Sequence, residues 1–338
     1  MPGGLPSRQR GVALLVAILL VALGTIIAAA MAYNNAMTAR RAAGTFEFDE
    51  AVLVAQGAEA LAAYGLQQTA KQNPTDTDPS QPWAQPVPPT PVAPGVMLQA
   101  SLEDLQGRFN INNLVETDGY TANMAAIAAF QRLLTELGLD PKWAYYVVDW
   151  IDKNTETTFS DGAEDSVYME LDPPYRMPHL PITSTSELLA LPGFTRAQFD
   201  VLAPHIVALP LGTQINVCTA DPWVLDALTG HVQFSEDPAQ FYKDRAAEGP
   251  CFPTPADVQT AANNVAGSSN TGSGSELGTN ANSGTGTTSL ASLIGQKSTW
   301  FRLTSYITLG TAEFAVYTLI YQDPTGMARP VMRSFTPD

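Results

Sequence analysis

The chain has 338 residues, with 33 acidic and 17 basic side chains and a formal net charge of −16 at pH 7. This length is sufficient for two domains of ordinary size. The excess of negative charge argues against binding to nucleic acid, because neutralisation of phosphates by Lys and Arg supplies most non-specific affinity for a polyanion.

The N-terminal segment contains an uncharged, apolar run over residues 12–33, which directly follows Arg8 and Arg10. About 20 apolar residues in a helix span the hydrocarbon core of a bilayer. Basic flanking residues favour the cytoplasmic side, so we expect one membrane pass with the bulk of the chain outside the cytoplasm. A secretory signal cleaved near residues 28–32 is the alternative, although the apolar run is long for such a signal.

The residues around Gly11 resemble the class III leader of type IV pilins and pseudopilins. This resemblance implies that a prepilin peptidase removes residues 1–11, the cytoplasmic leader, and that Val12 becomes a methylated N-terminus. Residues 12–33 would then remain as the transmembrane half of the N-terminal helix. Most members of that family carry Glu at the fifth mature position, which is Val16 here. In carrying a neutral residue at this position, the chain resembles the K-type minor pseudopilin of type II secretion systems.

The next segment, 34–71, contains no proline and is rich in residues that favour helix. Apolar residues recur in it at spacings of three, four or seven, so we expect one face to pack on a sheet. The residues of this stripe are Phe48, Val52, Ala55, Ala62 and Leu66. Short strands are predicted at 96–104 and 107–112, and an antiparallel meander at 300–309, 313–321 and 329–335.

Two further segments resemble the K-type pseudopilins. Residues 106–112 read Gln-Gly-Arg-Phe-Asn-Ile-Asn, similar to a signature that this family carries near the entry to its extra domain. Residues 215–220 match a second family pattern, Ile-Asn-Val-x-Thr-Ala, which also occurs in helix-hairpin-helix proteins. Taken without the resemblance, Gly107 marks a turn, and Asn110 and Asn112 provide hydrogen bonds for loop backbone.

A mainly helical pattern follows, with helices predicted at 122–137, 143–151, 186–191 and 196–206. The segment 191–194 resembles the turn of a helix-hairpin-helix unit, which makes a DNA-binding envelope protein an alternative. However, the expected second glycine of that turn is absent and no basic cluster surrounds it. We therefore interpret these helices as packing elements.

An acidic segment between the helices is the candidate metal site. Hard cations such as Ca²⁺ bind carboxylate, amide and carbonyl oxygens. Asp152, Asn154 and Glu156 alternate as at the start of an EF-hand, but Thr157 and Ala163 replace its glycine and its last glutamate. The segment instead resembles the metal loop of K-type pseudopilins, which implies a structural Ca²⁺. The candidate ligands are Asp149, Asp152, Asn154, Asp161, Glu164 and Asp165.

Two cysteines, Cys218 and Cys251, most simply form one disulfide in an exported chain. Neither has a histidine or a second redox cysteine nearby in the sequence, which argues against a catalytic thiol. The three histidines, His179, His205 and His231, are scattered along the chain, and we interpret them as structural or exposed.

The predicted fold class is α+β: a pilin-like long N-terminal helix packed on an antiparallel sheet, with a large inserted helical domain. Residues 34–120 would form the periplasmic helix and the first part of the pilin-like domain. Residues 121–212 would form the inserted metal-binding domain. Residues 213–338 would complete the pilin-like domain and include a flexible loop at 261–289.

The family resemblance implies a minor pseudopilin at the tip of the type II secretion pseudopilus, anchored in the inner membrane with its C-terminal bulk in the periplasm. It would nucleate or cap the filament with I- and J-type minor pseudopilins, the H type being a further candidate, and work with the inner-membrane secretion machinery to export folded proteins.

Two other classes stay open. A minor pilin of a type IV pilus shares the leader but needs no large helical insertion. A membrane-anchored hydrolase could use the acidic loop as a metal centre. However, the sequence lacks a Gly-x-Ser-x-Gly elbow, a His-Glu-x-x-His helix and a phosphate-binding Gly-Lys-Ser loop. We therefore expect no catalytic residues and no enzymatic activity.

Overall fold

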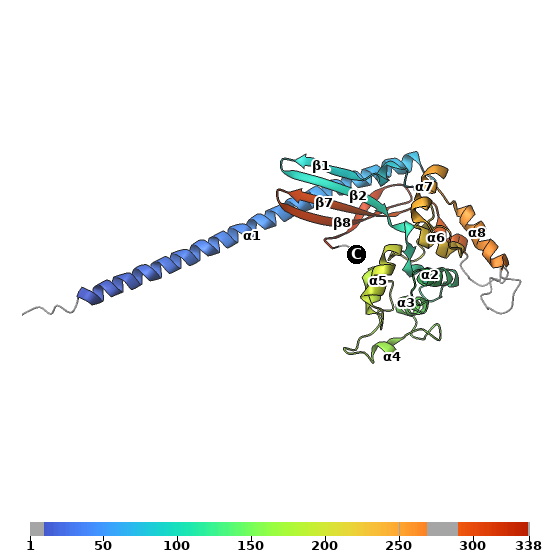
Figure 1. Ribbon diagram of the computed structural model, residues 1–338, viewed down its shortest axis with the longest axis horizontal. Helices are drawn as coiled ribbons and strands as arrows, with labels where there is room; N and C mark the ends of the chain where they lie inside the picture. The colour runs from blue at the N-terminus through green and yellow to red at the C-terminus, as the bar shows by residue number, and fades with distance from the viewer. Residues whose placement is uncertain (1–9, 250, 269–289, 337–338) are drawn as a thin grey trace, which may run out of the picture.

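The computed structural model describes residues 10–249, 251–268 and 290–336. Its first element is α1 (Arg10–Gln72), a continuous helix of 63 residues, about 95 Å long at 1.5 Å per residue. Figure 1 shows the N-terminal half of α1 projecting away from the rest of the molecule. Among the described residues, α1 is the one helix long and apolar enough to cross a membrane, and none of its apolar window is buried.

The C-terminal half of α1 packs on a five-stranded antiparallel sheet, as predicted (Figure 1). Ala55 and Leu66 of the predicted stripe are buried against Phe301 and Ile320. The strand order is β1-β2-β7-β8-β9. These strands are β1 (Val87–Ala93), β2 (Val96–Asp104), β7 (Trp300–Leu309), β8 (Ala312–Gln322) and β9 (Ala328–Ser334).

A second core belongs to a mainly helical domain inserted between β2 and β7, which lies away from the projecting part of α1 in Figure 1. Its α-helices are α2 (Met124–Glu136), α3 (Trp143–Ile151), α4 (Asp165–Tyr168), α5 (Arg196–Leu202), α6 (Pro222–Thr229), α7 (Pro238–Glu248), α8 (Pro255–Ser268) and α9 (Leu290–Leu293). Short 3₁₀ helices and two-residue strands complete it: η2 (Leu105–Gly107), β3 (Phe109–Asn110), η3 (Ile111–Leu114), η4 (Thr185–Ala190), η5 (Ala203–His205), β4 (Ile206–Val207), β5 (Ile215–Asn216) and β6 (Ile294–Gly295).

Four segments differ from the sequence expectation. One is the proline-rich strand β1, which was not predicted. The helical core continues past residue 212, because Val217, Leu225 and Phe241 are buried in it with the residues before them. The predicted strand at 107–112 is shortened to β3, with a 3₁₀ turn on either side. Of the predicted loop at 261–289, residues 261–268 belong to α8, and the remainder lies outside the described residues.

Candidate metal centre and domain junction

Helix α3 positions the first two acidic residues of the candidate metal centre. Its apolar side chains, among them Val148 and Ile151, are buried in the helical core, so the helix is held firmly. Asp149 lies within it and has no exposed surface. Asp152 is the C-cap, where the backbone turns to an extended conformation and leads into the acidic loop. The loop returns at Glu164, the N-cap residue of α4.

Several oxygens of these three carboxylates are buried without a hydrogen-bond partner. Asp149 Oδ1 accepts a bond from the Thr158 N–H at 3.1 Å, whereas Asp149 Oδ2 has none. Asp152 Oδ2 accepts from the Asn154 amide at 2.8 Å, whereas Asp152 Oδ1 has none, and neither Glu164 oxygen is bonded. A buried carboxylate without partners is costly, so this cluster needs either protons or a cation.

Burial raises the pKa of each carboxyl group in the cluster. It raises the pKa of Asp149, and that of Asp152 to about 6. Burial also raises the pKa of Glu164 to about 7, with the negative charge of Asp149 as the next cause. Raised pKa values are expected where carboxylates of like charge lie close together and away from solvent. A bound cation would lower these pKa values.

The remaining predicted ligands lie around this cluster. Asn154 supports the loop, donating to Asp152 and accepting from the Glu156 N–H at 2.9 Å. Asp165 Oδ1 accepts from the Met177 N–H at 3.0 Å. Asp161 is exposed. The structure therefore brings together Asp149, Asp152 and Glu164, and gives Asn154 and Asp165 contacts that hold the surrounding loop.

A fourth side chain in the cluster, His179, was interpreted from the sequence only as structural or exposed. One ring nitrogen of His179 and one oxygen each of Asp152 and Glu164 lie within 4.8 Å of one another. His179 follows Asp152 by 27 residues and has no local motif, so no sequence signal identified it. This spacing of one atom each from Asp152, Glu164 and His179 fits a divalent cation.

Close approach of the backbone at Gly162 completes the cluster. A Cβ at this position would lie 2.0 Å from Asp149 Oδ2 and 3.1 Å from the Phe159 carbonyl oxygen. Any larger residue would therefore displace the Asp149 carboxylate or the loop. The glycine is required for space, which allows the loop to close over α3.

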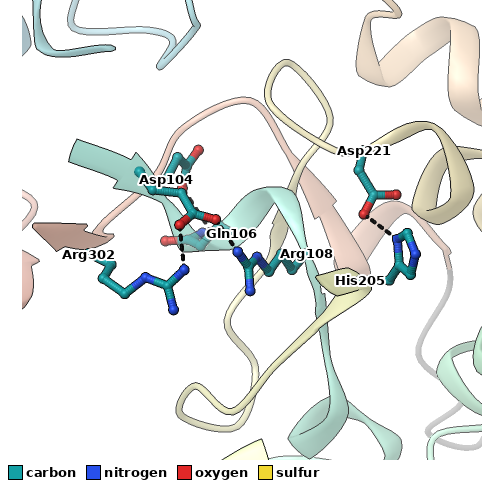
Figure 2. A network of polar contacts seen from close by, with 7 residues as sticks. Asp104, Gln106, Arg108, His205, Asp221 and Arg302 are labelled. Atoms are coloured by element: carbon teal, nitrogen blue, oxygen red, sulfur yellow. Dashed lines mark hydrogen bonds and ion pairs between the residues drawn. The ribbon is translucent and has the colours of Figure 1, made fainter. Parts of the chain in front are cut away.

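A second group of polar residues joins the sheet to the helical domain. Glu103 accepts hydrogen bonds from Arg108 and, at 2.7 Å, from Arg302, and Figure 2 shows both guanidinium groups pointing toward one carboxylate. Beside it, Asp104 is buried and accepts from the Ser298 hydroxyl at 2.6 Å. Burial raises the pKa of Asp104, against the effect of its hydrogen bonds.

The two segments that resemble the K-type family, residues 106–112 and 215–220, supply several hydrogen bonds of this junction. Gln106 accepts from the Thr299 N–H at 2.6 Å and donates to the Gln214 carbonyl oxygen at 2.7 Å. Asn112 donates to the Ile182 carbonyl oxygen at 2.8 Å. Asn216, from the second motif, donates to Asp104 at 3.0 Å. These contacts connect segments distant in sequence, so the motifs have a structural role.

The structure pairs Cys218 with Cys251, as predicted, with their Cα atoms 4.3 Å apart. The helix-hairpin-helix-like turn at Gly193 leads into α5, whose Arg196 pairs with Asp200 at 2.7 Å. Figure 2 also shows His205 facing Asp221, at 2.8 Å. Leu191 and Phe194 of the turn are buried in the helical core, which fits the packing role predicted for the helices.

Comparisons with known proteins agree on one family. A family model for type II secretion system protein K matches residues 107–211. The chain is 36% identical to the type II secretion system protein K of Klebsiella pneumoniae over 222 residues, which cover 64% of this chain and 68% of the relative. It is 32% identical to that of Pseudomonas aeruginosa over 241 residues, covering 69% and 70% respectively.

A solved structure also has a similar fold. It is a chain of the GspK–GspI–GspJ complex from the type 2 secretion system of enterotoxigenic Escherichia coli, with a TM-score of 0.66 and 21% identity. The match covers 88% of this chain and 100% of the other. The identity to these sequence relatives shows that this chain belongs to the type II secretion system protein K family of minor pseudopilins.

Proposed function

We propose that this minor pseudopilin occupies the tip of the type II secretion pseudopilus, where it nucleates or caps the filament that exports folded proteins. The observation that carries the proposal is the bulky helical domain attached beside a pilin-like helix and sheet. It would enlarge the head beyond the filament radius and hinder addition of a further subunit. The I- and J-type minor pseudopilins are its proposed partners, because the similar solved chain comes from a GspK–GspI–GspJ complex.

Position 16 supports the tip location. Val16 lies on the exposed apolar half of α1. A carboxylate within a bilayer is costly and is retained where it finds a partner, in related pilins the N-terminal amine of a neighbouring subunit. A neutral residue removes the need for a subunit ahead of this one. Neither the type IV minor pilin nor the DNA-binding alternative is favoured by the comparisons.

Substitution at this position tests the proposal. We expect Val16→Glu to lower filament initiation and secretion, because the new carboxylate requires a partner that a tip subunit lacks. Val16→Leu keeps the site apolar and serves as the matched control, with normal secretion expected. Initiation would be scored by counting pseudopili and secretion by the amount of exported protein. Normal assembly of Val16→Glu would contradict the role assigned to the neutral residue.

Processing and membrane location are a separate part of the proposal. Prepilin peptidase would cut after Gly11, and Val12 would be methylated, leaving α1 as an inner-membrane anchor with the bulk of the chain in the periplasm. Mass spectrometry of the mature N-terminus in the native protein tests this. A methylated Val12 is expected, whereas a mature chain starting near Asn34 would indicate a cleaved secretory signal.

We also propose that the metal centre binds a structural Ca²⁺. Asp149, Asp152 and Glu164 would hold it, since their buried oxygens lack partners. The ion would neutralise the like charges and pin the loop between α3 and α4, without a catalytic role. Ca²⁺ at about 100 times its Kd should raise the free energy of unfolding by about 2.7 kcal/mol. Thermal unfolding with Ca²⁺ and with chelator measures this, and no difference would contradict it.

A further inference from the structure

We propose that His179 is a direct metal ligand through Nε2, so that the centre binds Zn²⁺ and Mn²⁺ as well as Ca²⁺. This inference rests on the cation site proposed above and adds to it the chemical class of ion that the site accepts. Asp152, Glu164 and His179 each offer one atom to the cluster, and Asp149 Oδ2 is a further unbonded oxygen. The donor set is therefore mixed, with carboxylate oxygens and one imidazole nitrogen.

The hydrogen bond at Nδ1 sets the tautomer of the neutral His179 ring. Nδ1 lies 3.2 Å from the backbone carbonyl oxygen of Asp152. A carbonyl oxygen only accepts, so Nδ1 carries the hydrogen and Nε2 of the neutral ring presents a lone pair. Metal-binding histidines commonly donate their other ring N–H to a backbone carbonyl, which fixes the tautomer and the orientation of the ring.

The other side of the ring faces the carboxylates. Nε2 is buried and has no hydrogen-bond partner. Its nearest carboxylate oxygen, Glu164 Oε2, is 3.9 Å away, which is too far for a hydrogen bond. Both atoms are thus directed at a common space without bonding to each other. An ion between them would supply the partner that each lacks.

The backbone of His179 has an unusual conformation of the kind found at functional sites. Its φ of 49° is left-handed, and among the described residues it is the one non-glycine position with positive φ. Such conformations persist where the surroundings enforce them, and they are concentrated at functional sites. The following segment is anchored when Asn112 accepts a bond from the Ile182 N–H at 2.8 Å. The backbone that follows His179 is therefore held in place, while Nδ1 of the ring is held by the Asp152 carbonyl oxygen.

Imidazole changes the choice of ion. Ca²⁺ takes oxygen ligands, whereas imidazole nitrogen suits Zn²⁺ and other transition ions, and carboxylates suit Mn²⁺. Loss of the nitrogen should therefore reduce Zn²⁺ binding much more than Ca²⁺ binding. This differential is the property that separates a ligand from a residue that only packs beside the site.

The test uses the full-length chain in detergent, stripped of metal and titrated separately with ZnCl₂ and CaCl₂ by calorimetry. Asn tolerates a left-handed φ and offers an oxygen, so His179→Asn preserves the loop. We expect it to lower Zn²⁺ affinity by about tenfold or more and Ca²⁺ affinity by less than about threefold. His231→Asn, at an exposed histidine, is the matched control and should change neither affinity.

Zinc K-edge absorption gives an independent readout, since the wild-type complex should show an imidazole shell that His179→Asn lacks. Equal losses of Zn²⁺ and Ca²⁺ affinity, or no loss of Zn²⁺ affinity, would overturn the inference. If Ca²⁺ binds but Zn²⁺ binding does not depend on His179, only the inference fails. If the wild type binds neither ion, the proposed cation site fails with it. Melting curves without metal show whether the variant is folded.

Discussion

Two buried glutamates, one in each domain, differ in whether their carboxylates have partners within the chain. In the pilin-like domain, Glu59 on α1 is 3% exposed, and its oxygens accept bonds from Arg333 at 2.5 and 2.6 Å and from Thr318 at 2.8 Å. In the helical domain, Glu164 is 7% exposed, and neither of its oxygens has a hydrogen-bond partner. The first charge is neutralised within the chain, whereas the second requires something from outside it.

This contrast predicts that the two domains differ in how far their order depends on ions. The pilin-like domain supplies its own cation across the contact of α1 with β9, so the charge of Glu59 is balanced within the chain. The helical domain closes its acidic loop only if protons or a cation balance the charge. Its order should therefore depend on the ionic composition of the surroundings, whereas that of the sheet should not.

The largest effect is expected from breaking the internal pair. Arg333→Met leaves the buried Glu59 carboxylate without its cation, although the Arg333 side chain is itself 40% exposed. An unsatisfied buried acceptor costs about 3 kcal/mol at most when it is not fully desolvated, and we expect a loss of about this size. Urea unfolding of the full-length chain measures this loss. Arg329→Met, at an exposed residue of the same strand, is the control, with a change below about 0.5 kcal/mol. Similar losses in both variants would show that Glu59 does not need Arg333.

A smaller effect is expected at the metal centre. Gly162→Ala places a Cβ 2.0 Å from Asp149 Oδ2, so it should displace a proposed ligand and abolish stabilisation by Ca²⁺, a loss of about 2.7 kcal/mol at 100 times the Kd. Gly57→Ala is a useful control, because a Cβ there meets nothing within 4 Å and helix propensity favours Ala by about 1 kcal/mol. Thermal unfolding with and without Ca²⁺ separates the two variants. A Ca²⁺ response retained by Gly162→Ala would contradict the role of Asp149.

Sequence periodicity predicted the regular parts of the molecule well. The apolar stripe on the first helix and the alternation in β2, β7 and β8 follow from burial of one face, and the structure confirms them. Strand β1 was missed, because Pro88, Pro89 and Pro91 favour an extended connection. It is an edge strand, where proline is tolerated because fewer backbone N–H groups need partners.

The candidate site was predictable only in part, for a different reason. A run of acidic residues is visible in the sequence, and its resemblance to the K-type metal loop placed Asp149, Asp152 and Glu164 among six candidate ligands. Their role as ligands stays a prediction. Which oxygens remain without partners depends on tertiary contacts, such as the Thr158 N–H at Asp149. His179 reaches the cluster because a distant segment folds back, held by Asn112. Residues brought together by the fold leave no spacing pattern, and a local reading of the chain cannot find them.

A third carboxylate lies between the two extremes and gives the smallest expected effect. Glu136, at the end of α2, accepts a bond from the Ser235 hydroxyl at 2.5 Å but forms no ion pair with the described basic residues. Burial, with the nearby charge of Asp226 as the main further unfavourable contribution, raises the pKa of Glu136 to about 7. In the unfolded chain the group titrates near 4.3, so the folded state binds more protons between these values. Stability should then fall as pH rises from about 4.5 to 7.

Glu136→Gln should remove this pH dependence. After allowance for solvent screening of a partly buried group, we expect a contribution of about 1 kcal/mol. The measurement is urea unfolding of both proteins across this pH range, with Ca²⁺ present so that the metal centre is saturated. Glu116→Gln, a substitution of another acidic residue in the same domain, is the control and should keep the wild-type slope. If Glu136→Gln also keeps that slope, then one hydroxyl is enough to hold a half-buried carboxylate ionised, and a carboxylate of this kind needs no cation to balance its charge.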